Sequence, residues 1–500
     1  MTSPPSPALP PAPPGAAPTG AASPAPPGAA SPAPPGAASP AAPPFAPPSA
    51  PRVAFIHLDL GIGGAESLML SMAECLPPSH VTFYTCHCDP AHCYDQVKAP
   101  GGALAARVLR RGAFLPAELR GRFTALLSHA RVLFLALCLL LDTYILDRGR
   151  RYDVVLVDVL PTPLPLLRLL LPAAATLYYC HFPDKYLVRN TVNGRLVERA
   201  SLLRRLYRLP VDALENLCTK SADLTAVNSR FTAATFESAF PDIPDAPTVL
   251  YPAINLSQFI PPAPPAAKAQ ALGRSLTLLS MNRFERKKNV GLALEAFGLL
   301  RDRLPGGKRD RARLVVAGGY DPRNKENLEY MEELKGRARE LGIERHVDFR
   351  PSVSDEERAD LLQSSLCLLY TPDREHFGIV PLEAMYAGSP VIAVASGGPL
   401  ETVVDGETGF LREGTPEAFA EAAGRLARDV GLACRMGQRG NAHVREKFGL
   451  ETFEGNFRRL LGESGERGRR RRAEAAGWGR LLLTVALAVV LPVISAWAFR

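Results

Sequence analysis

Two glutamates in the stretch EHFGIVPLE, Glu375 and Glu383, lie eight residues apart around a histidine, a glycine and a proline. Paired carboxylates can act as general acid and general base, as in glycosidases, where the two groups flank the bond that breaks. They can also clamp a polar ligand by accepting hydrogen bonds from its hydroxyl groups. The spacing alone is compatible with both kinds of chemistry.

Pro381 gives the two glutamates different surroundings. Proline fits the first turn of a helix, where its missing N–H group costs nothing. Glu383 is therefore expected in the first turn of a helix, and Glu375 in the loop before it. The backbone N–H groups between them are suited to phosphate or sugar oxygens, and they belong to Phe377, Gly378 and Ile379. This arrangement favours a clamp over an acid–base pair.

A basic loop, NRFERKKN at residues 282–289, directly follows an apolar run. Arg283 offers a planar fork for phosphate oxygens, and Lys288 adds a compact positive charge. In AGGY, after another apolar run, Gly318 lets a ligand or a neighbouring backbone come close. Because the basic loop follows an expected strand, it indicates an anionic ligand rather than a solvated surface. AGGY by itself is compatible with a simple turn.

Two further candidates follow apolar runs nearer the N-terminus. In GIGGAE, Gly63 and Gly64 precede a stretch with helical periodicity, and a helix N-terminus favours negative charge. A plain tight turn explains the same glycines equally well. His181, in CHFP, is either a ligand-binding histidine or a hydrogen-bonded structural one.

The elements that position these residues alternate between apolar runs and helical stretches. The expected strands are residues 53–58, 81–85, 153–158, 176–180 and 224–228, then 276–281, 313–319, 347–350, 366–370 and 390–394. Such alternation predicts parallel sheets covered on both faces, here an α/β fold of two tandem doubly wound, Rossmann-like domains. Since ligands bind beyond the carboxyl ends of the strands, we expect the site in a cleft between the domains.

Composition suggests the remaining boundaries. Residues 1–51 are rich in Pro and Ala, with SPAPPGAA twice in tandem, and are expected to form a disordered arm. The domains are predicted at 52–258 and 272–462, joined by the Pro/Ala-rich run FIPPAPPAAKAQ at 259–270. A basic linker at 463–480 and a membrane segment at 481–499 would complete the chain.

Two apolar segments could contact a membrane. LLLTVALAVVLPVISAWA, residues 481–498, has 18 residues without a charge, with Trp478 and Trp497 near its ends. That length is enough to span hydrocarbon, and the arginines before it predict that its N-terminal side faces the cytosol. VLFLALCLLL, residues 132–141, is shorter and lies between Arg131 and Asp142. We expect it to form a buried or interfacial helix rather than a span.

Charge and cysteine content limit the partners. The net charge of +8 is concentrated in RGRRRR at residues 467–472, which favours a local anionic contact and no nucleic acid. Nine scattered cysteines suggest no disulfide framework. CHCDPAHC at residues 86–93 has no second cluster to complete a zinc site, so a strand-end loop is expected there.

In combination these motifs resemble those of retaining glycosyltransferases of family 4, which have the GT-B fold. FIHLDLGIGGAE, YYCHFPD, VNSRFTAATF, MNRFERKKN, VVAGGYD and YTPDREHFGIVPLEAMYAGSPVIAVASGGPLE are most similar to dolichol-pathway α-1,3/α-1,6-mannosyltransferases of the endoplasmic reticulum. The resemblance extends over residues 53–461 and leaves out the Pro-rich arm.

The resemblance implies a role for each matched residue. Arg283 and Lys288 would neutralise the donor diphosphate as it leaves. Glu375 would hold hydroxyls of the transferred sugar, and Glu383 the nucleotide ribose. His181 would hydrogen-bond the sugar near its reacting face.

The resemblance also implies the substrates. The glycines of GIGGAE would lie by the phosphates and the incoming acceptor, in an acceptor domain at 52–258 that faces a nucleotide-sugar domain at 272–462. The donor would be GDP-mannose, and the acceptor a dolichol-diphosphate oligosaccharide on the cytosolic face of the endoplasmic reticulum. No metal or other cofactor is implied, whereas a complex with other dolichol-pathway mannosyltransferases is.

Two other functions are compatible with the sequence. One is a family 4 transferase with a different nucleotide sugar or glycolipid acceptor. The other is a non-catalytic membrane adaptor whose Pro-rich arm binds aromatic-grooved domains. The intact set of Arg283, Lys288, Glu375 and Glu383 favours an enzyme.

Overall fold

The structure is a computed structural model that describes residues 50–119, 123–146, 151–187, 191–192, 195–196, 202–254 and 263–498. At residues 187–207, where described, and from residue 475 onward, only the backbone is described. Almost all of the arm predicted at residues 1–51 lies outside the described residues.

The first sheet has seven parallel strands in the order β3-β2-β1-β4-β5-β8-β9. They are β1 Val53–Ile56, β2 Val81–Thr85, β3 Val108–Arg110, β4 Val154–Asp158, β5 Ala175–Cys180, β8 Leu224–Val227 and β9 Thr248–Val249. The strand order reverses between β1 and β4. In a doubly wound sheet, ligands bind beyond the carboxyl ends of the strands at such a point.

Helices cover both faces of this sheet. They are α1 Gly64–Glu74, α2 Thr124–Leu141, α3 Leu164–Leu170, α4 Asp184–Leu187, α5 Leu202–Thr219 and α6 Arg230–Ala239; a short hairpin, β6 Thr191–Val192 and β7 Arg195–Leu196, lies between α4 and α5. Phe55 packs in one cluster with Leu68 of α1, and its neighbour Ile56 in another cluster with Leu135 of α2. Successive strand residues therefore bury opposite faces, as expected for a parallel sheet.

The second sheet has six parallel strands in the order β12-β11-β10-β13-β14-β15. They are β10 Leu276–Met281, β11 Ala312–Gly318, β12 Val347–Pro351, β13 Cys367–Tyr370, β14 Val391–Val394 and β15 Gly409–Arg412. The surrounding helices are α8 Gly291–Arg303, α9 Gly306–Arg309, α10 Lys325–Glu340, α11 Asp355–Ser364, α12 Ile379–Tyr386, α13 Pro399–Thr402, α14 Pro416–Arg428 and α15 Val430–Phe448.

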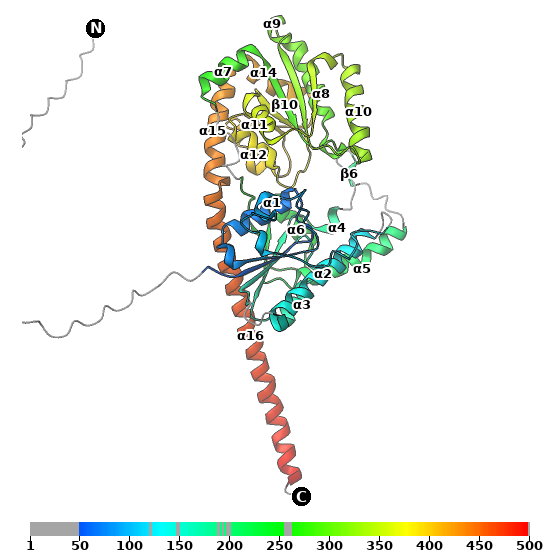
Figure 1. Ribbon diagram of the computed structural model, residues 1–500, viewed down its shortest axis with the longest axis vertical. Helices are drawn as coiled ribbons and strands as arrows, with labels where there is room; N and C mark the ends of the chain where they lie inside the picture. The colour runs from blue at the N-terminus through cyan, green and yellow to red at the C-terminus, as the bar shows by residue number, and fades with distance from the viewer. Residues whose placement is uncertain are drawn as a thin grey trace, which may run out of the picture. The chain divides into compact units, whose positions relative to one another are not determined.

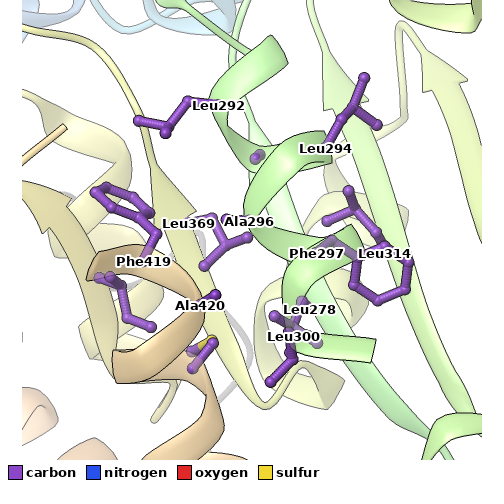
Figure 2. Packing of buried hydrophobic residues seen from close by; sticks show 14 of the residues in the cluster. Leu278, Leu292, Leu294, Ala296, Phe297, Leu300, Leu314, Leu369, Phe419 and Ala420 are labelled. Carbon is purple, nitrogen blue, oxygen red and sulfur yellow. The ribbon is translucent and has the colours of Figure 1, made fainter. Parts of the chain in front are cut away.

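Helices α8 and α14 pack against one face of this sheet. Figure 2 shows Phe297 and Leu300 of α8 close to Leu314 and Leu278 of the sheet. Phe297 is fully buried. We expect Phe297→Ala to lower the free energy of unfolding by about 3–5 kcal/mol, because it removes buried surface and leaves a cavity. Melting of this variant beside Leu328→Ala, a change at an exposed site on α10 that should cost less than about 0.5 kcal/mol, checks the prediction.

The ten strands predicted from apolar runs are confirmed, with boundaries within two residues. Strands β3, β9 and β15 and the hairpin β6–β7 were not predicted from the sequence. Strands β3, β6, β7 and β9 have three residues or fewer, and β15, GFLR, begins with a glycine and ends with an arginine. None of them has the continuous apolar pattern of a central strand.

The predicted linker at residues 259–270 is wrong from Pro265 onward, where helix α7, Pro265–Arg274, begins. Proline at the first helical position and the alanines after it both favour a helix. Lys268 of α7 is buried, and its Nζ donates to Gly388 O at 2.6 Å and to Ser389 Oγ at 2.7 Å. Burial lowers the pKa of Lys268 to about 8. These bonds fix α7 to the second domain.

A long helix, α16 Leu450–Ala498, returns to the first domain (Figure 1). Phe453 and Phe457 pack in the cluster that contains Val53 and Phe55, so the start of α16 covers one face of the first sheet. Residues 463–480, expected to be a linker, and residues 481–498, expected to be a membrane segment, both have a helical backbone. Membrane insertion of the latter and the domain boundaries stay predictions.

The arginine run in α16 contacts this chain itself. Arg467 pairs with Asp245 at 2.8 Å, and Arg471 with Asp223 at 2.9 Å. The anionic contact predicted for RGRRRR is therefore made in part by carboxylates of the first domain.

Helix α2 is longer than the apolar run at residues 132–141 indicated. It begins at Thr124, and a π-helical turn, Asp142–Leu146, continues it. The stretch Thr124–Leu146 is the one helical stretch, among the residues described in full, whose length and composition would allow it to cross a membrane. The expectation that this run is short is corrected, because weakly apolar residues before Val132 extend the helix. Its face with Leu135 and Leu139 is buried on the sheet.

Candidate active site

Lys288 and Glu375 form an ion pair at the carboxyl ends of neighbouring strands. Lys288 ends a single helical turn, η6 Arg286–Lys288, that follows β10, and Glu375 lies in the loop after β13. The ammonium Nζ donates to the Glu375 Oε2, and both side chains are largely buried. Burial would raise the pKa of Glu375, but Lys288 outweighs it and lowers that pKa below its ordinary value. Glu375 is therefore a carboxylate at neutral pH.

The glycines near Glu375 allow loops to pack without side chains between them. A Cβ on Gly397 would lie 2.3 Å from Glu375 O, and one on Gly398 2.2 Å from Phe377 O. A Cβ on Gly318, whose φ is +142°, would lie 2.0 Å from Asn282 O. Gly318 thus brings the loops after β10 and β11 together, and a role of its own in ligand binding stays a prediction.

Arg283 lies in the same loop as Lys288 but has a different environment. Its side chain is 63% exposed and pairs with Glu285 at 3.2 Å. On the other side, Glu285 pairs with Lys287 at 3.0 Å. Arg283 is therefore accessible, and its one ion pair among the described residues, with the largely buried Glu285, is one that a phosphate could replace.

Glu383 is not in contact with Glu375 in the described structure. It is the fifth residue of α12, so it lies one turn further in than predicted. It is buried and pairs with Arg358 of α11. Burial raises the pKa of Glu383, although Arg358 opposes the change. The two glutamates have separate partners, which supports the clamp over a shared acid–base role.

The N-terminus of α12 lies between the two glutamates. Gly378 is its cap residue with φ of +84°, and glycine has no side chain to accept from the N–H groups of the first turn. Those N–H groups, including that of Ile379, are suited to an anion. The ring of Phe377 is buried against Tyr251, so the backbone of Phe377 is the part left for a ligand.

Gly63 and Gly64 are at the start of α1 and differ in their surroundings. A Cβ on Gly63 would lie 2.4 Å from Oε2 of Glu66, whereas one on Gly64 would meet nothing within 4 Å. Gly63 O accepts hydrogen bonds from Ser67 N at 3.0 Å and from Tyr94 Oη at 3.1 Å. These two hydrogen bonds hold the turn in place, and the space beside Gly64 is open.

His181 directly follows β5, at the same edge of the first sheet. Its carbonyl accepts a hydrogen bond from Asn228 Nδ2 at 3.0 Å, and its ring lies edge-on to Tyr179. The Nε2 atom lies 3.4 Å from Asp158 Oδ2. The side chain is 24% exposed, so one edge of the ring is accessible.

Contacts through His376 connect the two halves of the site. Phe182 stacks on the His376 ring with centroids 3.8 Å apart, and Ser229 Oγ donates to His376 O at 2.6 Å. Burial lowers the pKa of His376 to about 4, although the adjacent Glu375 opposes this. The neutral ring of His376, the residue after Glu375, is therefore in contact with Phe182, the residue after His181.

Other residues of this region were not proposed as site residues from the sequence. Glu401 accepts hydrogen bonds from Arg230 N and Phe231 N, each at 2.8 Å, and so binds the N-terminus of α6 to the second domain. His57 and Asp158, at the ends of β1 and β4, form a hydrogen bond of 2.7 Å. A polar residue at the end of each apolar run was the available indication.

The cysteine cluster is not arranged around one point. Cys88 and Cys93 pack in the cluster on one face of the first sheet, and Cys86 in the cluster on the other. Within the residues described, no three histidine, cysteine or acidic side chains converge as metal ligands would.

The fold and two family models together define a glycosyltransferase with the GT-B fold. A family model described as Glycosyltransferase Family 4 matches residues 62–258, and one described as Glycosyl transferases group 1 matches residues 266–443. Sucrose-phosphate synthase from Thermosynechococcus elongatus superposes with a TM-score of 0.60 at 21% identity, over 85% of this chain and 99% of its own. WaaG, a glycosyltransferase of lipopolysaccharide biosynthesis, gives 0.54 at 18%, over 82% and 99%.

Relatives with much higher identity narrow the class. The human alpha-1,3/1,6-mannosyltransferase ALG2 is 43% identical over 407 residues, which are 80% of this chain and 93% of the human protein. The Saccharomyces cerevisiae protein of that name is 38% identical, over 82% of this chain and 85% of its own. The chain belongs to the ALG2 family of alpha-1,3/1,6-mannosyltransferases. The predicted family, fold and enzyme class are confirmed.

Proposed function

We propose that the chain transfers mannose, with retention, from GDP-mannose to Man1GlcNAc2-diphosphodolichol, in the synthesis of the lipid-linked oligosaccharide for N-glycosylation. The names of its relatives support the two linkages, α-1,3 and α-1,6. The observation that carries the proposal is the Lys288–Glu375 pair at the carboxyl ends of adjacent strands. It places a cation and a hydroxyl-binding carboxylate side by side, as a nucleotide sugar requires.

Lys288 and Arg283 would stabilise the leaving diphosphate. Negative charge gathers on this group as the glycosidic bond breaks, and cations already in place lower the energy of the transition state. Lys288 supplies a charge held inside the site, and exposed Arg283 supplies a second one from the same loop. The N-terminus of α12, with its free N–H groups at Phe377, Gly378 and Ile379, adds partial positive charge.

Glu375 would bind the transferred sugar. A carboxylate accepts hydrogen bonds at both oxygens, and Lys288 occupies only one of them, Oε2. When the diphosphate takes over Lys288, Oε2 of Glu375 becomes available to mannose hydroxyls. The ion pair thus keeps Glu375 ionised until the donor separates the two side chains.

Glu383 would bind the ribose of the donor from one turn further along α12. Its partner Arg358 keeps it from being an isolated buried charge. Gly318 would line the donor side by letting the loops after β10 and β11 lie close together.

His181 and the turn at Gly63–Gly64 would face the acceptor. Both lie beyond the carboxyl ends of strands near the point where the strand order reverses: the turn follows β1, and His181 follows β5. The stacking of Phe182 on His376 brings His181 towards the loop of Glu375. We place the transferred mannose between His181 and Glu375, with both linkages made at this one centre.

A lipid acceptor requires membrane contact. Helix α2, the π-helical turn after it and helix α3 carry exposed apolar side chains, Leu137, Leu141, Ile145, Leu169 and Leu170. The end of the chain is basic and then apolar. These favour association with the endoplasmic reticulum membrane, with the catalytic domains on the cytosolic face. There the enzyme would work in a complex with other dolichol-pathway mannosyltransferases.

A comparison of donors tests the proposal. The purified full chain is incubated with lipid-diphosphate chitobiose carrying one mannose, and with GDP-mannose, UDP-glucose or UDP-N-acetylglucosamine in separate reactions. We expect two sugars to be added with GDP-mannose and none with the other donors. Transfer from a different nucleotide sugar, with none from GDP-mannose, would identify another family 4 activity instead.

A further inference from the structure

Four side chains form a connected polar network at the carboxyl ends of strands in the first sheet. His57 Nδ1 donates to Asp158 Oδ2 at 2.7 Å, and His57 Nε2 lies 3.7 Å from Glu66 Oε1. The same Oδ2 of Asp158 lies 3.4 Å from His181 Nε2. His57, Asp158 and His181 come from the ends of β1, β4 and β5, which are neighbours in the sheet. The network therefore joins the glycine turn of α1 to His181.

The middle of this network is buried and ionised. His57 is 3% exposed and Asp158 is 2% exposed. Burial would lower the pKa of His57, but Asp158 and Glu66 outweigh it and raise that pKa to about 10. Burial would likewise raise the pKa of Asp158, but the two histidines bring it down to about 2. His57 is thus an imidazolium, and its Nε2 donates to Asp59 O at 3.0 Å.

This arrangement sets which nitrogen of His181 carries a proton. Nε2 of His181 is buried and faces a carboxylate that accepts only, so a proton on Nε2 is favoured. In the neutral ring, Nδ1 then carries a lone pair. A distance of 3.4 Å is long for a hydrogen bond, and catalytic contacts often shorten only when substrate binds.

We propose that His57 and Asp158 are positioning residues that hold the His181 ring with Nδ1 as the acceptor for a hydroxyl of the substrate sugar. The hydrogen bond from His57 holds the Asp158 carboxylate in position, and this carboxylate orients the His181 ring. The inference rests on the proposed function, since it needs a sugar at His181. It adds that His181 accepts the hydrogen bond from the sugar through Nδ1. It also adds that His57 and Asp158, which do not touch the substrate, fix the orientation of the His181 ring.

A double-mutant cycle tests the proposal in the full chain. Loss of one hydrogen bond should lower kcat for mannose transfer by about 10–100-fold in His181→Ala, and Asp158→Asn should cause a similar loss. KM for GDP-mannose should stay within about twofold, because the donor diphosphate is bound elsewhere. The double variant should match His181→Ala within about twofold, since Asp158 acts through His181.

A purely structural role for Asp158 would give another result. The two losses would then multiply in the double variant, or Asp158→Asn would keep the natural kcat, and either outcome overturns the proposal. If Asp158→Asn does not fold, as judged by melting, His57→Leu replaces it in the cycle. That variant removes the donor towards Asp158, and the same two criteria apply to it.

The cycle also separates this inference from the proposed function. Natural kcat in His181→Ala would overturn the positioning role while leaving mannose transfer in place. Loss of the proposed function would show instead as an absence of mannose transfer by the natural chain.

Discussion

Lys288→Ala is expected to lower kcat for mannose transfer by about 10²–10³-fold, because it removes the buried cation that meets the charge of the leaving diphosphate. Lys288 lies in the loop after β10 and touches Glu375, so the change acts where the donor phosphates would bind. Initial rates with GDP-mannose at saturating donor and acceptor give the measurement.

Lys287→Ala is the matched control. Lys287 is the preceding residue, is 67% exposed and pairs with Glu285 rather than Glu375. It should keep kcat within about twofold, because its exposed side chain pairs with Glu285 and lies outside the Lys288–Glu375 pair. If Lys288→Ala is folded and has the same kcat as the natural chain, Lys288 does not take part in the reaction.

Glu375→Gln is expected to lower kcat by about 10²–10³-fold as well, for a different reason. Each hydrogen bond to a charged group contributes about 1.5–3 kcal/mol, and the carboxylate offers two oxygens to the sugar. The pKa of Glu375 lies below its ordinary value of 4.5, so Glu375 stays ionised from about pH 4.5 to neutral pH. Protonation of Glu375 should therefore not lower the kcat of the natural chain in that range.

Binding of GDP distinguishes the two variants. GDP carries the diphosphate but no mannose, so calorimetry should show that Glu375→Gln binds GDP as the natural chain does. Lys288→Ala should bind it at least about tenfold more weakly, since a charged hydrogen bond of about 1.5 kcal/mol or more is lost. The opposite pattern would exchange the roles assigned to these two residues.

The fold could be predicted from the sequence where the strands are central. Runs such as VTFYT and LTLLSM are buried on both faces, so every residue is apolar or small. Short edge strands such as β9, Thr248–Val249, contain too few residues to show a pattern. Helix α7 was missed because the prolines before it resemble a linker, although the last of them begins the helix.

The candidate site could be predicted in part. Lys288 and Glu375 are 87 residues apart, and their contact follows from the rule that parallel strands end at one edge. The burial of Glu383 against Arg358 could not be predicted, because Arg358 is on a separate helix with no motif around it. The same holds for His57 and Asp158, which meet only because β1 and β4 are neighbours.

The central claim is that one centre around Lys288 and Glu375 makes both linkages from GDP-mannose. The most direct measurement is linkage analysis of the lipid-linked product made by the natural chain and by Lys288→Ala, with Lys287→Ala as control. We predict both α-1,3 and α-1,6 mannose with the natural and control chains, and a parallel loss of both with Lys288→Ala. If one linkage persisted at the natural rate in Lys288→Ala, a second centre would have to make it, and the account would be contradicted.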